Sequence, residues 1–186
     1  EYIKDMGTPD RYYAVCDDVV SGKVARLNRT YSRPAVFLDR DGVINCEVDL
    51  LHRVEQMQLI PGAAKAIRRI NQMGYLAIVV TNQPVIARNL CSFEELEQIH
   101  MQMETLLGHE HAYVNAIYFC PHHPDGGYPE ERKEYKIPCN CRKPAPGMLL
   151  QAAKDWNIDL ENSYMIGDSQ RDIEAGHNAG VKQSIL

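Results

Sequence analysis

Short runs of consecutive apolar residues alternate along the chain with segments in which apolar residues recur every three or four positions. The first pattern is typical of buried strands, and the second is typical of helices that cover them. Strands are expected at five places: 35–38, 75–80, 114–119, 163–166 and 181–186. Helices are expected at 61–74, 92–106, 146–156 and 172–179, with a further short one at 17–29.

Two of the expected helices carry more detailed signals. Ser92 and Glu95 have the spacing of a capping box, which marks the start of a helix. The apolar stripe of that helix is expected to consist of Leu96, Ile99, Met103 and Leu106. In the helix that opens at Pro61-Gly62 and stops at Gly74, the residues expected on the core face are Ala63, Ala66, Ile67 and Ile70.

Alternation of strands and helices predicts right-handed strand–helix–strand units, and therefore a Rossmann-like α/β fold with a parallel sheet flanked by helices. One such domain is expected over 35–186, preceded by an N-terminal extension over 1–34. No segment is large enough to form a separate cap domain over the sheet. Because the fifth strand begins close to residue 186, truncation of the domain at this end is one interpretation.

Charge and composition narrow the class of protein. A net charge of −5 over 186 residues, with a pI near 5.8, argues against a nucleic-acid partner. No apolar run approaches the ~20 residues that span a bilayer, and the N-terminus lacks the apolar core of a signal peptide. Six cysteines in a chain with ample apolar residues for a core favour thiols over disulfides, and hence a reducing, cytoplasmic location.

Polar residues follow the expected strands where parallel sheets bind ligands, beyond the carboxyl ends. Asp39 and Asp41 come directly after the first strand, Thr81 after the second and Asp168 after the fourth. An ionised Asp39 can attack phosphorus, and Asp41 can protonate the leaving oxygen. Mg²⁺ suits these oxygen ligands and would offset the repulsion between carboxylate and phosphate, with Asp168 as a further ligand.

The hydroxyl of Thr81 and the charge of Lys143 are suited to hold the phosphoryl oxygens. Taken alone, two aspartates two positions apart are more often a solvated turn. Because Thr81, Lys143 and Asp168 accompany them in order along the chain, the catalytic interpretation is favoured.

A second candidate site follows the third expected strand. Cys120 and His122 are separated by sixteen residues from Cys139 and Cys141, so that three thiolates and one imidazole are available. This set predicts a closed, structural Zn²⁺ site that anchors the adjacent Arg142 and Lys143. His123 is the alternative imidazole, and three free cysteines with a surface histidine are the alternative to a metal site.

Four segments together resemble the haloacid dehalogenase superfamily: 37–45 (FLDRDGVIN), 79–83 (VVTNQ), 141–144 (CRKP) and 167–172 (GDSQRD). Together with the cysteine loop (residues 120–141), these segments are similar to the heptose 1,7-bisphosphate phosphatases of that superfamily over residues 35–186. The resemblance implies a haloacid dehalogenase-like fold and a phosphatase that removes the C7 phosphate of a small phosphorylated sugar through an aspartyl phosphate.

The resemblance also implies roles. Asp39 would be the nucleophile and Asp41 the general acid and base, while Thr81 and Lys143 would stabilise the phosphoryl group. Mg²⁺ would be held by Asp39, the backbone carbonyl of Asp41 and Asp168, with Asp172 behind them. The residues expected to contact substrate are Arg40, Asn45, Glu47, Asp49, Asn82, Gln83 and Arg142.

Other functions remain open at this level. Histidinol-phosphate phosphatases have a similar cysteine site with a shorter insert between the two ligand pairs. Histidinol phosphate, or another small phosphate ester, is therefore an alternative substrate. A different class is a zinc-stabilised interaction domain whose catalytic loops have drifted. Its support is the segment 84–89 (PVIARN), where the superfamily members usually have SGIARG, which predicts a stiffer loop. Ser169 also replaces a common lysine.

The N-terminal segment 1–13 (EYIKDMGTPDRYY) resembles the end of the catalytic domain of sugar-phosphate nucleotidyltransferases. This implies a fusion, with a nucleotidyltransferase domain upstream of the phosphatase. The alternative is an unrelated polar extension.

Overall fold

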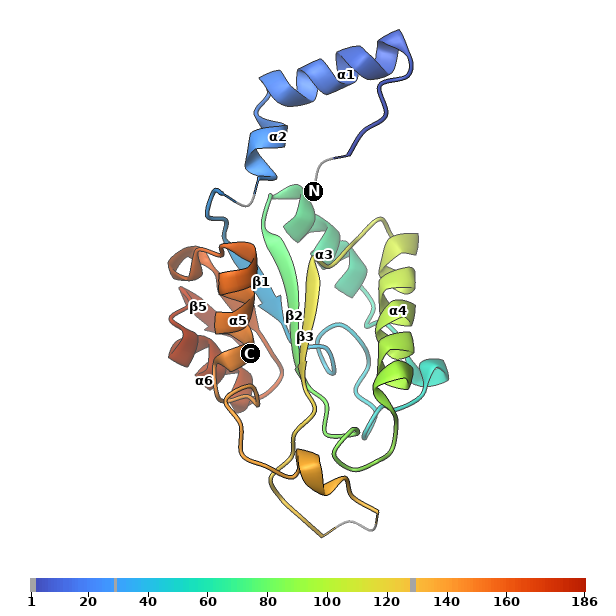
Figure 1. Cartoon of the computed structure of the whole chain (residues 1–186), viewed down its shortest axis with the longest axis vertical. Coiled ribbons are helices and arrows are strands. Elements are labelled where there is room, and N and C mark those ends of the chain that lie inside the picture. The colour runs from blue at the N-terminus through green and yellow to red at the C-terminus, as the bar shows by residue number, and fades with distance from the viewer. Residues whose placement is uncertain (1–2, 29, 128–129) are drawn as a thin grey trace. The chain divides into compact units, whose positions relative to one another are not determined.

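The computed structural model describes residues 3–28, 30–127 and 130–186, and the chain forms two compact units, Glu1–Ser32 and Arg33–Leu186 (Figure 1). Glu1 and Tyr2, which begin the segment that resembles a nucleotidyltransferase, lie outside the described residues, as does Arg29 at the end of the expected short helix.

The first unit contains helix α1 (Pro9–Val20) and the short helix α2 (Lys23–Arg26). The prediction of one helix over 17–29 is therefore wrong. Thr8 accepts a hydrogen bond from the backbone N–H of Arg11 and Pro9 occupies the first turn, so the helix begins well before residue 17. Gly22 then adopts a left-handed φ of 73°, which ends regular helix between the two segments.

The second unit is built on a five-stranded parallel sheet, in the order β3-β2-β1-β4-β5. The strands are β1 (Ala35–Leu38), β2 (Leu76–Asn82), β3 (Ala116–Cys120), β4 (Tyr164–Ile166) and β5 (Gln183–Ile185). In the register, Phe37 of the central strand lies between Ile78 of β2 and Met165 of β4. The predicted Rossmann-like fold class is confirmed.

Helices cover both faces of this sheet (Figure 1). The α-helices are α3 (Ala63–Gln72), α4 (Phe93–His109), α5 (Gly147–Trp156) and α6 (Gln170–Ala179), and single turns of 3₁₀ helix are η1 (Val54–Gln56), η2 (Lys133–Tyr135) and η3 (Leu160–Asn162). Val36 and Leu38 pack in the cluster with α3 and α4, whereas Ala35 and Phe37 pack in the cluster with α5 and α6. Because both faces are covered, the strand is apolar at every position.

Two helix faces differ in detail from the prediction. In α3 the buried residues are Ala64 and Ile67, while Ala66 is exposed, so the expected face was placed incorrectly by part of a turn. In α4, Leu107 is buried and Leu106 is only half-buried. The capping box predicted for Ser92 and Glu95 is confirmed. Among the described residues, no helix has the length and apolar character needed to cross a membrane.

Candidate active site and cysteine cluster

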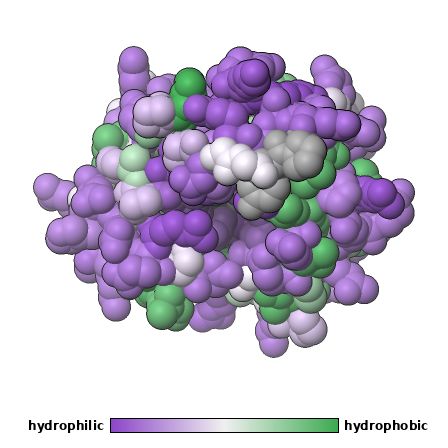
Figure 2. Space-filling model, turned by 90° about the horizontal axis from the view of Figure 1, so that it is seen from below, coloured by the Kyte–Doolittle hydropathy of each residue, from purple (hydrophilic) through white to green (hydrophobic). Residues whose placement is uncertain are grey.

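A cavity of about 300 Å³ lies where the strands end. Figure 2 views the molecule from below Figure 1, and this face is mostly hydrophilic around a central hollow. The predicted catalytic and metal-binding aspartates, threonine and lysine all line the cavity: Asp39, Asp41, Thr81, Lys143 and Asp168. Of the residues expected to contact substrate, those that line it are Glu47, Asp49, Asn82, Gln83 and Arg142. The topology therefore brings four sequence-distant motifs to one edge of the sheet.

Asp39 follows β1 directly, and its backbone N–H donates to the carbonyl of Ile166 in β4 at 2.9 Å. One carboxylate oxygen, Oδ1, accepts from the backbone N–H of Arg40 at 2.7 Å and lies 2.9 Å from Nζ of Lys143. Burial, with a smaller contribution from Asp172, raises the pKa of Asp39 to about 6, although the charge of Lys143 opposes this shift. The carboxylate is thus poorly solvated and ionised near neutral pH.

Lys143 is held from two directions. Its Nζ lies 2.5 Å from Oδ1 of Asp172, which is completely buried, and 2.9 Å from Asp39. The side-chain amide of Asn82 also pairs with the lysine backbone, accepting from its N–H at 3.0 Å and donating to its carbonyl at 3.1 Å. Asn82 therefore fixes Lys143, a relationship that nothing in the linear spacing indicated.

Three carboxylates converge beside this lysine. Oxygen atoms of Asp39, Asp168 and Asp172 lie within 4.8 Å of one another, close enough to share a divalent cation. Gly42 keeps this space open: its φ is 76°, and a Cβ at this position would meet Oδ2 of Asp168 at 2.0 Å. Oxygen donors around a space that cannot accommodate a side chain fit the predicted Mg²⁺ site.

Asp41 is surrounded by donors. Its Oδ1 accepts from Arg40 and from the amide of Asn45 at 2.9 Å, and its Oδ2 accepts from Arg40 and from the amide of Gln83, also at 2.9 Å. Gln83 donates to Thr81 Oγ1 as well, at 2.8 Å. Both carboxylate oxygens are therefore fixed while the side chain still reaches the cavity.

The structure does not bring two of the expected substrate contacts to the cavity. Arg40 and Asn45 are both completely buried, and neither lines the cavity. In this structure neither side chain is placed to contact a substrate in the cavity, and direct contact stays a prediction. Each contacts Asp41 instead, because this partly buried carboxylate needs donors and these residues are its neighbours along the tight loop after β1.

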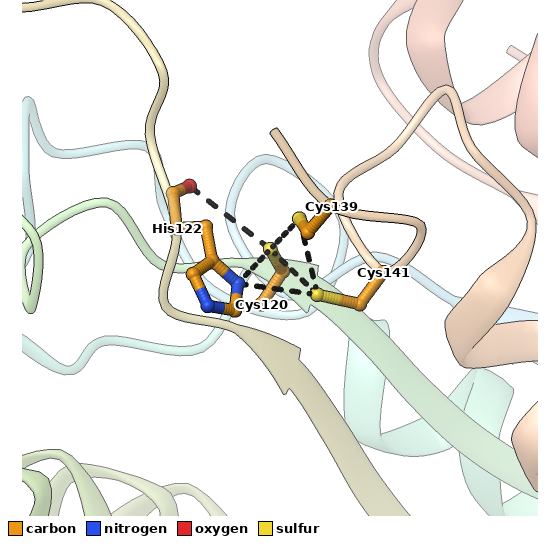
Figure 3. A group of neighbouring side chains, drawn as sticks. All are labelled: Cys120, His122, Cys139 and Cys141. Carbon is orange, nitrogen blue, oxygen red and sulfur yellow. Dashed lines mark hydrogen bonds between the residues drawn. The ribbon is translucent and has the colours of Figure 1, made fainter. Parts of the chain in front are cut away.

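The cysteine cluster forms beside the cavity, at the end of β3. Figure 3 shows Cys120, His122, Cys139 and Cys141 turned toward one another. The sulfur–sulfur distances are 3.1 to 3.5 Å, and Nδ1 of His122 lies 3.4 Å from Cys141 Sγ and 3.7 Å from Cys120 Sγ. These distances approach the ~3.8 Å edge of a tetrahedron with Zn–S bonds of about 2.3 Å.

The cluster contains His122 and not the alternative His123, which lies 4.0 Å from Asp125 instead. Burial raises the pKa of the Cys120 and Cys141 thiols. A metal ion bound among thiols this close together would displace their protons and bind the thiolates. Arg142 follows the cluster directly, and its Nη1 donates to the carbonyl of His122 at 3.0 Å.

The altered segment 84–89 packs between the cavity and the cysteine loop. Val85, Ile86 and Ala87 are buried. Asn89 has a φ of 57°, a conformation that asparagine tolerates better than most residues, and its side chain accepts from Nε of Arg132 at 2.6 Å. Asn89, which stands where superfamily members usually have glycine, therefore fits the local backbone. Its contact with Arg132 links the segment 84–89 to the cysteine loop.

Comparisons with known proteins agree with this fold. Residues 140–186 match the family model described as HAD-hydrolase-like. The D-glycero-beta-D-manno-heptose-1,7-bisphosphate 7-phosphatase of Pasteurella multocida is 42% identical over 154 residues, covering 83% of this chain and 81% of the relative. The Escherichia coli enzyme of the same name is 39% identical over 155 residues, covering 83% and 79%.

Among solved structures, a D,D-heptose 1,7-bisphosphate phosphatase from B. bronchiseptica, complexed with magnesium and phosphate, superposes with a TM-score of 0.70. It is 36% identical, with 80% of this chain and 77% of that chain covered. The parallel sheet and its strand-end carboxylates define a hydrolase of the haloacid dehalogenase type. The chain belongs to the haloacid dehalogenase-like phosphatases that include these heptose bisphosphate enzymes.

Proposed function

We propose that this chain hydrolyses the C7 phosphate of D-glycero-D-manno-heptose 1,7-bisphosphate, through an aspartyl phosphate at Asp39 and with Mg²⁺. The observation that carries the proposal is the arrangement around Asp39, where Lys143, a carboxylate trio and Asp41 meet in one cavity. The names of the relatives, each about 40% identical, support the choice of substrate.

In the first step, an oxygen of the Asp39 carboxylate attacks phosphorus. The bond between phosphorus and the C7 oxygen breaks, its electron pair stays on that oxygen, and the oxygen takes a proton from Asp41. Lys143 and Thr81 face the cavity, where they can bind the phosphoryl oxygens as charge develops. The products of this step are the sugar hydroxyl and the phosphorylated Asp39.

In the second step, Asp41 takes a proton from water while the water oxygen attacks phosphorus. The bond between phosphorus and the Asp39 oxygen breaks with its electron pair left on that oxygen, so inorganic phosphate leaves and the carboxylate of Asp39 is restored. The same residue therefore acts first as an acid and then as a base, which requires that its carboxylate stay close to one position throughout.

Mg²⁺ would be held by Asp39, Asp168 and the backbone carbonyl of Asp41, with Asp172 positioned behind. The cation would offset the repulsion between the attacking carboxylate and the phosphate. The charge of Lys143 serves the same end, and Arg142, Glu47 and Asp49 would face the sugar from the cavity wall.

Zn²⁺ would occupy the cysteine cluster as a structural ion, since four protein ligands leave no position for substrate. Arg142 and Lys143 follow Cys141 directly, so the metal would fix the start of the segment that carries both cations. Thiolate ligands of this kind are best preserved in a reducing compartment, which supports a cytoplasmic location.

We propose in addition that residues 1–34 are the tail of a nucleotidyltransferase domain with its linker. The support is the sequence resemblance of 1–13 and the separate compact unit that Glu1–Ser32 forms. A nucleotidyltransferase and a sugar bisphosphate phosphatase act on related sugar phosphates, so a fusion of the two is coherent.

The substrate is tested by following phosphate release in Mg²⁺ from both anomers of heptose 1,7-bisphosphate and from histidinol phosphate. Phosphorus and proton NMR of the product would identify which phosphate was lost. The proposal expects a heptose 1-phosphate product and at least about tenfold lower kcat/KM for histidinol phosphate. Loss of the C1 phosphate, or preference for histidinol phosphate, would contradict it. Asp17→Asn, an exposed change in the first unit, serves as the matched control for aspartate variants.

A further inference from the structure

Behind Asp41, buried side chains from three parts of the chain form one connected polar network. Arg40 comes from the loop after β1, Gln83 follows β2, and His100 comes from the middle of α4. Arg40 is completely buried, and His100 is 7% exposed. Neither Arg40 nor His100 lines the cavity, so neither is placed to touch a substrate there.

The guanidinium of Arg40 uses its nitrogens in a defined way. Its Nε and Nη2 donate to the carboxylate of Asp41 at 2.9 to 3.2 Å, and Nη2 also donates to Oε1 of Gln83 at 3.0 Å. The remaining nitrogen, Nη1, lies 3.3 Å from Nε2 of His100. A guanidinium has five N–H groups in a rigid plane, so fixing Nη1 fixes the orientation of the whole group.

The contact with Arg40 determines the state of the histidine. Because a guanidinium can only donate, Nε2 of His100 must accept, and the ring is neutral with its proton on Nδ1. Burial, together with the charge of Arg40, lowers the pKa of His100 to about 3, which agrees with a neutral ring. The ring also packs against Phe119 of β3, with centroids 5.7 Å apart, so it is held in place from a second side.

We propose that Arg40 and His100 are positioning residues for the phosphatase reaction: His100 holds the guanidinium of Arg40, which holds the carboxylate of Asp41 where it exchanges protons with the leaving oxygen and with water. This inference rests on the proposed role of Asp41. It gives His100, which belongs to no motif of the sequence, a role in the reaction. It also gives Arg40 a role in holding Asp41 in place of the expected contact with substrate.

A purely structural role for the same network predicts a different result. A network that only stabilises the fold would, when weakened, lower thermal stability and leave turnover by the folded fraction unchanged. Asp41 also acts in the second step, which is the same for every substrate, so the first step is compared through kcat/KM. A network that positions a general acid would lower kcat/KM most for substrates whose leaving group needs a proton. An alkoxide, as in a sugar phosphate, needs that proton, whereas nitrophenolate leaves without one.

The test compares heptose 1,7-bisphosphate with p-nitrophenyl phosphate for the wild type, His100→Leu, His100→Gln and Arg40→Lys. The control is His109→Leu, an exposed change at the end of the same helix. For His100→Leu, kcat/KM for the sugar phosphate should fall about 10- to 100-fold, with a much smaller fall for p-nitrophenyl phosphate. Because a glutamine amide also offers an acceptor, His100→Gln should recover most of the loss.

Equal losses of kcat/KM on the two substrates, or unchanged kcat/KM in folded His100→Leu, would overturn the inference. If His100→Leu does not fold, Arg40→Lys decides, because lysine keeps the charge and loses the planar fork. The same substrate dependence in Arg40→Lys supports the inference, and its absence overturns it. Asp41→Asn separates the acid–base role of Asp41 from the positioning role of Arg40 and His100. If Asp41→Asn affects the two substrates equally, the proposed role of Asp41 fails. If only Asp41→Asn affects them unequally, the positioning role alone is contradicted.

Discussion

The buried carboxylate of Asp172 joins the start of helix α6 to Nζ of Lys143. Its Oδ2 accepts from the backbone N–H of Ser169 at 3.0 Å and from the Ser169 hydroxyl at 2.6 Å, while Oδ1 lies 2.5 Å from the lysine nitrogen. One side chain therefore caps a helix and places a cation beside Asp39. This contact explains why an acidic residue occupies a completely buried position.

Replacement of Asp172 by asparagine should lower kcat by about tenfold or more, because Lys143 loses a charged partner and its position relative to Asp39. Asparagine can still accept from Ser169, so α6 should remain capped and the melting temperature should change little. Ser169→Ala is the complementary control, since it removes a hydroxyl from the cap and leaves the lysine contact. Steady-state kinetics with thermal denaturation of both variants checks this, and a normal kcat in Asp172→Asn would contradict it.

Gly42→Ala should weaken Mg²⁺ binding strongly. The new Cβ would lie 2.0 Å from Oδ2 of Asp168, so this carboxylate must leave its present position in the group with Asp39 and Asp172. The backbone strain of alanine at a φ of 76° costs about 1 kcal/mol by itself. Gly74→Ala is the matched control, because Gly74 has a φ of 85° and nothing lies within 4 Å of its Cβ position. Titration calorimetry should find weaker Mg²⁺ binding only in Gly42→Ala, and equal affinities in the two variants would count against the metal site.

Loss of the zinc proposed for the cysteine cluster should lower activity and leave Mg²⁺ binding intact. Cys139→Ser removes one thiolate from the cluster in Figure 3, and Arg142 and Lys143 should then lose their fixed start. We expect about one zinc per chain by elemental analysis in the wild type and in Cys16→Ser, much less in Cys139→Ser, and a kcat at least several-fold lower in the zinc-poor variant. A wild type purified without zinc that is fully active would refute this account.

Protons and Mg²⁺ should compete at Asp39. Burial raises the pKa of this carboxyl to about 6, so it is ionised at pH 7.5 and mostly protonated at pH 5. A protonated carboxyl does not bind the cation, so the apparent Mg²⁺ affinity should fall by up to about tenfold per pH unit below pH 6. Calorimetric titration between pH 7.5 and 5 measures this. Asp39→Asn should bind more weakly and without this dependence, and a flat wild-type profile would contradict the prediction.

The positions of the strands along the chain and the clustering of motifs could be predicted from the sequence, because both follow from local patterns. Apolar runs closed by polar residues mark buried parallel strands, and parallel strands bring their ends to one edge. Asp39, Thr81 and Asp168 lie within a few residues of such ends, so their meeting in one cavity followed from the topology.

The supporting contacts could not be predicted in the same way. His100 is one of several residues at helical spacing in α4, and only the tertiary structure turns it toward Arg40. The amide pairing between Asn82 and Lys143 joins residues 61 positions apart. Arg40 was expected to contact substrate, yet its side chain is completely buried. Burial and side-chain direction decide such roles, and neither follows from spacing alone.

The claim that Asp39 carries the phosphoryl group is tested most directly by trapping. Wild type and Asp39→Asn are each mixed with heptose 1,7-bisphosphate and Mg²⁺, quenched in acid and reduced with borohydride, which converts an aspartyl phosphate to homoserine. Our account predicts homoserine at position 39 of the wild type by peptide mass spectrometry, with no trapped residue and no phosphate release in Asp39→Asn. Phosphate release by folded Asp39→Asn at the wild-type rate, or trapping at another residue, would contradict it.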